Sequence, residues 1–303
     1  MSKAGRILHP AILVCVLAGA PYGVAGSQGF EPTSNHFLSG KSQLSYRTYG
    51  KGKPVILLAG GPGMESGYLV PVAQAIAEAE REAILLDLRG LGGSSGASRD
   101  ELTVAGGVAD IEALRHSLGA DKVTLLGHSF GGALAQAYSA VHSEHVERLI
   151  LLDSVGTDLA PARDTALATS WMKSLTGQER VDYAAAKANG NADRAIRIKF
   201  LGSMVNRGKG EAFVRSLPSP VTNAGVQARM SQDYKANYHV GYSPVGFPIT
   251  IIYGDQDWIR AWQPELTQAY RAAHIILIPG SSHFPWIDNP SGTALAIKEA
   301  LVQ

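Results

Sequence analysis

The chain has 303 residues, of which 45% are hydrophobic and 17% charged, with a formal net charge of +1 and a single cysteine. This length suits one large α/β domain or two small domains, and the composition excludes an intrinsically disordered chain. One cysteine excludes a disulfide framework and a cysteine-rich metal site, and the near-neutral charge gives no support for a nucleic-acid partner.

The first 26 residues have the layout of a secretory signal peptide. Lys3 and Arg6 precede an apolar run over residues 11–20, and small residues follow up to Gly26. This order predicts cleavage near Gly26 and a secreted or periplasmic protein, with a disordered or anchoring N-terminus as the alternative. Because no apolar run reaches the roughly 20 residues that a membrane span needs, we expect no stable membrane insertion after cleavage.

Short apolar stretches separated by helical segments predict a mostly parallel sheet. The alternating stretch 43–49 predicts an edge strand, and continuous apolar runs predict strands that are covered on both faces. These runs cover residues 54–59, 83–86, 123–126, 149–152, 249–253 and 275–278, and residues 68–80, 104–118 and 131–142 predict the helices between them. This alternation indicates βαβ units and therefore an α/β fold.

The alternation breaks between residues 156 and 247. This interval has helical stretches at 165–175, 179–188 and 191–200, and its 12 Lys and Arg residues outnumber 7 Asp and Glu residues, so it is net basic. A helical insertion between two parts of a sheet predicts a cap or lid. We therefore predict a core of residues 27–155 and 248–303, with a helical cap of residues 156–247 inserted after the sixth strand.

A candidate nucleophile lies between a predicted strand and a predicted helix. The segment Gly127-His128-Ser129-Phe130-Gly131 matches G-x-S-x-G in this context, which predicts a sharp turn that presents Ser129 at a strained backbone angle. The helix N-terminus behind Ser129 favours developing negative charge. The alternative is an ordinary tight turn with a solvated serine. We expect His128 to be a packed neighbour and not a second base.

A serine hydroxyl needs an adjacent base, and a carboxylate must orient that base. His283 follows the last predicted strand and is the candidate base. Asp257 follows the strand at 249–253 and is the candidate acid, with Asp255 and Asp153 as the alternatives. The chain order is then Ser, acid, His.

Acyl transfer also needs two N–H donors directed at the carbonyl oxygen of the substrate. The residue after the nucleophile, Phe130, supplies one backbone N–H in this prediction. The Gly/Pro run 60–63, after the strand at 54–59, offers the second, for which we choose the N–H of Gly61. The alternative is that this run is only a tight turn.

Together these motifs resemble the α/β-hydrolase superfamily of Ser-His-Asp enzymes, over nearly the whole of residues 46–301. Residues 59–63 resemble the H-G-G-P-G loop of the prolyl iminopeptidase branch, although the usual His, which braces the loop in the family, is Ala59 here. Three further segments resemble family motifs: residues 87–94 (D-x-R-G-x-G-x-S), 254–257 (G-x-x-D) and 280–286 (G-x-x-H-F-P-W). In the family the last residue of G-x-x-D is the acid, which favours Asp257.

The resemblance implies a serine hydrolase that cleaves an ester or related acyl bond of a small molecule. Related prolyl iminopeptidases hold the substrate amine with acidic cap residues, and the net basic interval here favours an ester. A prolyl iminopeptidase-like aminopeptidase, a non-catalytic ligand-binding homologue, and an acyltransferase or lyase with the same triad are the alternatives. Epoxide hydrolases and haloalkane dehalogenases of this fold use Asp as the nucleophile, which argues against both.

No cofactor or metal is expected, because the sequence has no dinucleotide fingerprint, no P-loop and no clustered metal ligands. Trp258 and Trp286 each follow closely on a predicted triad residue, and Met64 follows the predicted oxyanion loop. These three side chains are candidates to line a substrate pocket, and core packing is the alternative. The sequence does not define the oligomeric state.

Overall fold

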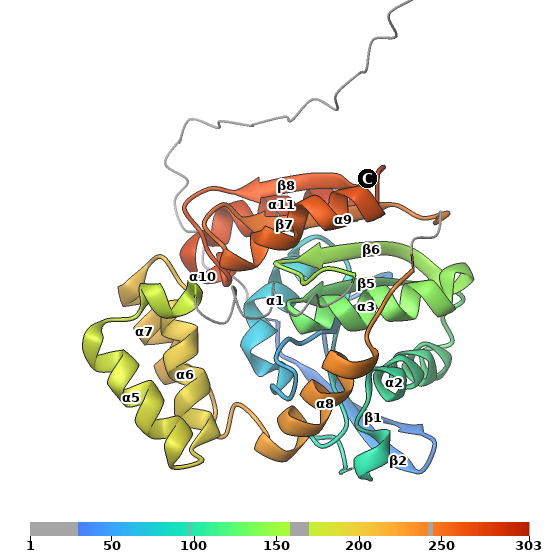
Figure 1. Cartoon of the computed structure of the whole chain (residues 1–303). Helices are drawn as coiled ribbons and strands as arrows, with labels where there is room; N and C mark the ends of the chain where they lie inside the picture. The colour runs from blue at the N-terminus through green and yellow to red at the C-terminus, as the bar shows by residue number, and fades with distance from the viewer. Residues whose placement is uncertain (1–29, 97, 158–169, 242–244, 303) are drawn as a thin grey trace, which may run out of the picture.

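The computed structural model describes residues 30–96, 98–157, 170–241 and 245–302. The segment predicted as a signal peptide lies outside these residues. Figure 1 shows a central sheet with helices on both faces, and the helices α5, α6 and α7 as a separate group beside it.

The centre of the molecule is an eight-stranded sheet with the strand order β1-β2-β4-β3-β5-β6-β7-β8. The strands are β1 (Thr33–Ser39), β2 (Ser42–Tyr49), β3 (Pro54–Leu58), β4 (Glu82–Asp87), β5 (Val123–His128), β6 (Val146–Leu152), β7 (Ile249–Gly254) and β8 (His274–Ile278). The strands β3 to β8 pair in parallel, whereas β1 and β2 are antiparallel to their neighbours. This topology confirms the predicted α/β fold with a mostly parallel sheet.

The predicted edge strand is not at the edge. Residues 43–49 form most of β2, which pairs with β4 on one side and with β1 on the other. Gly40, at φ 60, lies in the turn between β1 and β2, in a conformation that glycine adopts without strain. The sequence does not predict β1, because most of its side chains are exposed and no apolar run marks it.

Helices cover both faces of the sheet, because alternate strand residues point to opposite sides. Ile56 belongs to one buried apolar cluster and Leu57 to the other. The first cluster contains side chains of α2 (Val104–Ser117), α3 (Phe130–Val141) and α9 (Gln263–Ala269). The second contains side chains of α1 (Val70–Glu78), α10 (Pro285–Asp288) and α11 (Pro290–Val302), together with the 3₁₀ turn Ser66–Leu69.

The interval predicted as a cap is helical where the structure describes it. It contains a 3₁₀ turn at Trp171–Ser174 and the helices α5 (Gly177–Ala188), α6 (Ala192–Gly202), α7 (Arg207–Ser216) and α8 (Ala224–Asn237). Residues 165–169 of the first predicted stretch lie outside the described residues.

The helix α8 packs on the opposite face of the core from α6 and α7, whose Ile196, Phe200 and Val214 belong to the apolar cluster of α1 and α11. Val226, Met230 and Tyr234 belong to the same apolar cluster as α2 and α3. An Asp233 carboxylate oxygen also accepts a hydrogen bond from the Val104 N–H at the start of α2, at 2.8 Å. Figure 1 shows α8 close to α2 and away from α5 to α7. The cap boundaries at residues 156 and 247 stay a prediction.

Within the described residues, no helix has the length and apolar character that crossing a membrane requires.

Candidate functional site

Ser129 occupies the strained turn that the sequence predicts. It lies between β5 and α3 with φ 56 and ψ −119, in the left-handed region that non-glycine residues rarely adopt. A Cβ at Gly131 would collide with the Leu58 carbonyl, and one at Gly127 would collide with the Gly131 carbonyl. The small residues on either side of Ser129 are therefore required by close backbone contacts.

His283 and Asp257 form a hydrogen-bonded pair at the same end of the sheet as Ser129, where the parallel strands end. The distance between His283 Nδ1 and Asp257 Oδ2 is 2.9 Å, and the Asp257 side chain is completely buried. Since Nδ1 donates to this carboxylate, Nε2 is left as the proton acceptor. The second oxygen of Asp257 accepts a hydrogen bond from the Ile259 N–H at 3.0 Å.

The carboxyl ends of three strands bring these residues together. Ser129 follows β5, Asp257 follows β7 and His283 follows β8. The ring of His128, next to Ser129, lies 4.6 Å from the ring of His283, measured between centroids. The described structure contains no hydrogen bond between Ser129 Oγ and His283 Nε2, a contact that is often long in an enzyme without substrate.

The two alternative acids lie in different places. Asp255 Oδ1 accepts a hydrogen bond from the Ser281 N–H at 3.2 Å, so this residue braces the loop before His283. Asp153 follows β6, and one of its oxygens lies within 4.8 Å of both an Asp257 oxygen and a His283 ring nitrogen. His283 Nδ1 donates to Asp257 and not to Asp153.

A chain of buried hydrogen bonds connects the loop after β3 to the segment that carries His283. His128 Nε2 lies 2.9 Å from the His283 carbonyl oxygen, which can only accept, so Nε2 carries the proton. His128 Nδ1 is then an acceptor, and the Tyr68 hydroxyl donates to it at 2.8 Å. The Tyr68 oxygen in turn accepts the Gly60 N–H at 2.6 Å.

Burial, and then the neighbouring His283, hold the pKa of His128 well below its usual range. His128 is therefore neutral, as this chain of bonds requires, and it is a packed neighbour of Ser129 as predicted. The sequence did not single out Tyr68, because nothing in its local pattern distinguishes a bridging tyrosine from one that only packs.

The backbone N–H groups proposed as oxyanion donors lie next to this chain. Gly61 has φ 122, a conformation that favours glycine, and Phe130 is the first residue of α3. No hydrogen bond of the described residues uses either N–H group. Both groups are therefore available to a ligand.

The three candidate pocket residues have different surroundings. Trp286 is 4% exposed and packs against the rings of His128 and Tyr68, at centroid distances of 4.9 and 6.1 Å. Met64 is buried in the same apolar cluster. Trp258 is only partly buried, and its ring lies 5.4 Å from the His283 ring. Of the three, Trp258 is the best placed to face a substrate.

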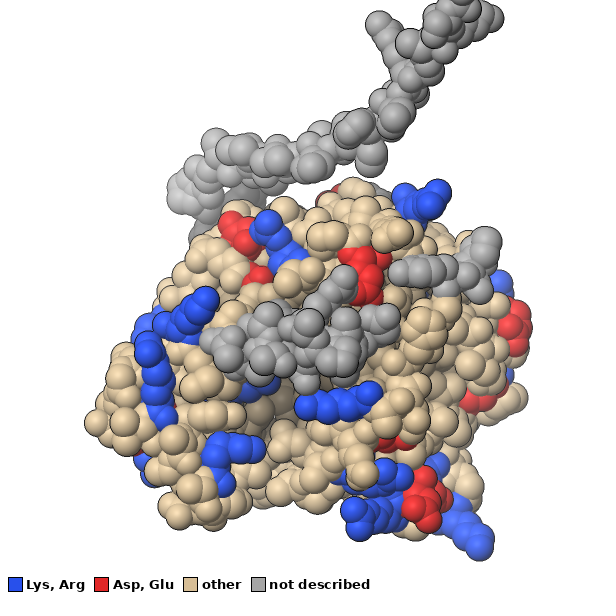
Figure 2. Space-filling model, viewed as in Figure 1, with Lys and Arg blue, Asp and Glu red and all other residues tan. Residues whose placement is uncertain are grey.

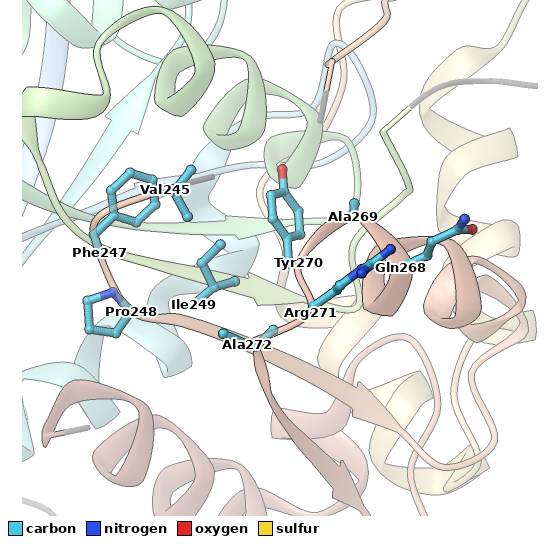
Figure 3. A pocket seen from close by; sticks show the side chains of 10 residues that line it. Val245, Phe247, Pro248, Ile249, Gln268, Ala269, Tyr270, Arg271 and Ala272 are labelled. Atoms are coloured by element: carbon cyan, nitrogen blue, oxygen red, sulfur yellow. The ribbon is translucent and has the colours of Figure 1, made fainter. Parts of the chain in front are cut away.

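A cavity of about 570 Å³ lies elsewhere (Figure 3). Its walls come from Val245, residues 247–249 and residues 268–273, at the amino ends of β7 and β8. Ser129, Asp257 and His283 follow the carboxyl ends of their strands, so this cavity is at the opposite end of the sheet. It is therefore not a pocket for chemistry at Ser129.

Comparison with known proteins agrees with this architecture. Residues 53–290 match the family model described as the alpha/beta hydrolase fold. The chain is 27% identical over 278 residues to a 1-acylglycerol-3-phosphate O-acyltransferase of Arabidopsis thaliana. This alignment covers 82% of this chain and 66% of the relative. It is 37% identical over 98 residues to a proline iminopeptidase of Thermoplasma volcanium, covering 32% of this chain and 33% of the relative.

A solved structure of similar shape is the 2-hydroxy-6-oxo-6-phenylhexa-2,4-dienoate hydrolase of Rhodococcus sp. strain RHA1. The two structures align with a TM-score of 0.72 and 18% sequence identity, over 90% of this chain and 100% of that one. This likeness shows the fold alone.

The chain belongs to the alpha/beta hydrolase family. It spans about two thirds of the length of the plant relative and a third of the iminopeptidase.

Proposed function

We propose that this protein is a serine hydrolase that cleaves an ester of a small molecule through an acyl-enzyme intermediate. The observation that carries the proposal is the strained turn at Ser129 beside the buried His283–Asp257 pair. Backbone strain of this kind persists only where the surroundings impose it, and strained residues cluster at active sites, which supports a catalytic role for Ser129.

In this proposal His283 Nε2 takes the proton of Ser129 Oγ as the oxygen attacks the carbonyl carbon of the ester. Asp257 holds the imidazole in the correct tautomer and stabilises the imidazolium that forms. His283 then gives the proton to the leaving alkoxide, and the alcohol departs. Water attacks the acyl-enzyme with His283 as the base, which releases the carboxylic acid and restores Ser129.

The N–H groups of Gly61 and Phe130 would bind the oxygen that becomes negative in each tetrahedral intermediate. Removing one such donor typically raises the barrier by about 2.7–4 kcal/mol. The loop that carries Gly61 is held by the Gly60–Tyr68 bond. This bond supports the loop at a place where the family's usual His is Ala59.

The partners of the acidic residues in the interval 156–247 favour an ester over a peptide with a free amine. Each acidic residue of this interval that the structure describes already has a partner within the protein. The ion pairs are Glu179 and Glu211 with Arg207, Asp182 with Arg194, and Asp193 with Arg197, and Asp233 accepts a hydrogen bond from the Val104 N–H. Lys and Arg side chains are spread over the face shown in Figure 2. A substrate ammonium group would therefore compete with existing partners for these carboxylates.

We further propose that the protein is exported, since residues 1–26 have the order of a signal peptide. Cell fractionation with mass spectrometry of the N-terminus tests this: exported protein with a new N-terminus near Ser27 is expected, and a chain that stays in the cytoplasm with its N-terminus intact would contradict it.

The proposed reaction is tested with a short-chain p-nitrophenyl ester and with proline p-nitroanilide. Ester cleavage that far exceeds anilide cleavage is expected. Ser129→Gly is the preferred control, because glycine adopts φ 56 without strain and lacks the hydroxyl. Dominant anilide cleavage would overturn the ester preference, and ester cleavage equal in wild type and Ser129→Gly would overturn the nucleophile.

Acyl transfer is a second candidate, favoured by the similarity to the plant acyltransferase over 82% of this chain. The same acyl-enzyme would then pass its acyl group to an alcohol instead of water. Adding an alcohol to the ester assay separates the two, since a transferase yields a new ester in place of the free acid.

A further inference from the structure

A second carboxyl group lies against the proposed triad. The Asp153 side chain is completely buried directly after β6, and one of its oxygens lies within 4.8 Å of Asp257 and His283. Residue 153 has φ 44, in a left-handed region that Asp and Asn adopt more readily than most residues. Two buried carboxyl groups therefore share the surroundings of one imidazole.

The two oxygens of Asp153 have different partners. Oδ1 accepts a hydrogen bond from the Gly254 N–H at 2.8 Å. Oδ2 is buried and has no hydrogen-bond partner among the described residues. An ionised Oδ2 at this place would be an unpartnered charge beside another carboxylate, which is strongly unfavourable. An oxygen that carries a proton, in contrast, needs only an acceptor.

Asp257 can supply that acceptor. Its Oδ1 accepts from the Ile259 N–H and its Oδ2 from His283 Nδ1. An ionised carboxylate offers about four lone-pair sites, so one further hydrogen bond can be accepted.

We propose that Asp153 keeps its proton at neutral pH and donates it in a hydrogen bond to the Asp257 carboxylate. Asp153 is then a positioning residue: it orients the acid that orients the base, without touching substrate. This role rests on the proposed triad.

The surrounding groups agree with a protonated Asp153. Burial, and then the neighbouring Asp257, raise the pKa of Asp153 well above its ordinary value. The carboxylate of Asp288 acts in the same direction. The Tyr253 hydroxyl, also nearby, donates to the Ser154 carbonyl at 2.6 Å, and burial raises its pKa, so this phenol is neutral.

Two substitutions at residue 153 test whether Asp153 acts as a hydrogen-bond donor or as a charged carboxylate. Asp153→Asn keeps an acceptor for Gly254 and places an N–H₂ donor toward Asp257, and asparagine tolerates φ 44. We expect kcat within about threefold of wild type. Asp153→Gly also fits this backbone but removes the donor, so kcat should fall about 10- to 100-fold with little change in KM, as for one hydrogen bond to a charged group.

The proton itself is detected by infrared difference spectroscopy at pH 7. The spectrum of wild type minus Asp153→Asn should show the carbonyl band of a protonated carboxyl, and Asp255→Asn, changed in the neighbouring loop, should leave that band in place. The absence of the band would overturn the proposal. So would an Asp153→Asn variant as slow as Asp257→Asn, or an Asp153→Gly variant as fast as wild type. If wild type cleaves no ester, the proposed function fails, and the infrared band still decides the protonation of Asp153.

Discussion

Replacing Tyr68 with phenylalanine tests the hydrogen-bond chain between the loop after β3 and the His283 segment. The ring would keep its packing against Phe200, Phe284 and Trp286. Only the hydroxyl is lost, and with it the acceptor for the Gly60 N–H and the donor to His128 Nδ1. The change is therefore confined to two buried hydrogen bonds.

The expected loss follows from burial. Tyr68 and His128 are 0% and 1% exposed, so water cannot replace the missing oxygen without rearrangement. A buried polar group left without a partner costs about 1–3 kcal/mol, and two such groups remain, which gives about 2–6 kcal/mol. This is a large part of the roughly 5–15 kcal/mol that stabilises a typical domain. Activity should fall as well, because the freed loop carries Gly61.

Urea unfolding of wild type, Tyr68→Phe and Tyr270→Phe measures the effect. Tyr270 is a matched control, because its hydroxyl makes one long hydrogen bond, 3.3 Å to Gln136. We expect the Tyr270 variant to lose less than about 1 kcal/mol. A Tyr68 variant as stable and as active as the Tyr270 variant would refute the reasoning.

Three further predictions concern other parts of the same site. The pKa of His128 in the folded protein lies below its unfolded value of 6.5, so the stability that neutral His128 contributes is present above pH 6.5 and is lost as pH falls, by up to about 1.4 kcal/mol per pH unit. The unfolding free energy of wild type should therefore drop more steeply below pH 6.5 than that of His128→Gln, and parallel slopes would contradict this. Gly131→Ala should prevent accumulation of folded protein, since its Cβ meets the Leu58 carbonyl, whereas Gly177→Ala, with open space around it, should express normally. Asp288→Ala should lower both the thermal midpoint and the rate of ester cleavage, because the Asp288 carboxylate accepts hydrogen bonds from the N–H groups of Val205, Asn206 and Ser282, the residue before His283. An unchanged rate would show that these hydrogen bonds do not position His283.

Apolar runs predicted the sheet well because strands buried on both faces need continuous hydrophobic side chains. The run at 54–59 became β3 and the run at 249–253 became β7, to within one residue at each end. The same signal failed for β1, whose exposed side chains belong to an edge strand. It also does not mark α7 and α8, which begin after the capping residues Asn206 and Asn223.

The candidate triad could be predicted because its residues follow strand ends in a known order. The contacts around it could not. Tyr68 and Asp153 lie far from His283 in sequence, and their contacts depend on how the 3₁₀ turn Ser66–Leu69 and the end of β6 pack against the site. Similarly, Trp286 and Trp258 look alike in the sequence, yet Trp286 is buried in the core, whereas the partly buried Trp258 has its ring 5.4 Å from the His283 ring. Burial decides such cases, and burial is a property of the whole fold.

Covalent labelling tests the central claim most directly. Folded protein is treated with an organophosphonate and examined by intact mass and peptide mapping, alongside Ser129→Gly and His283→Ala. We expect one adduct, on the peptide that contains Ser129, with no adduct in Ser129→Gly and labelling slowed by on the order of 100-fold or more in His283→Ala. Folded wild type that takes up no label, or takes it up at another residue, would contradict the assignment of Ser129 as a nucleophile activated by His283.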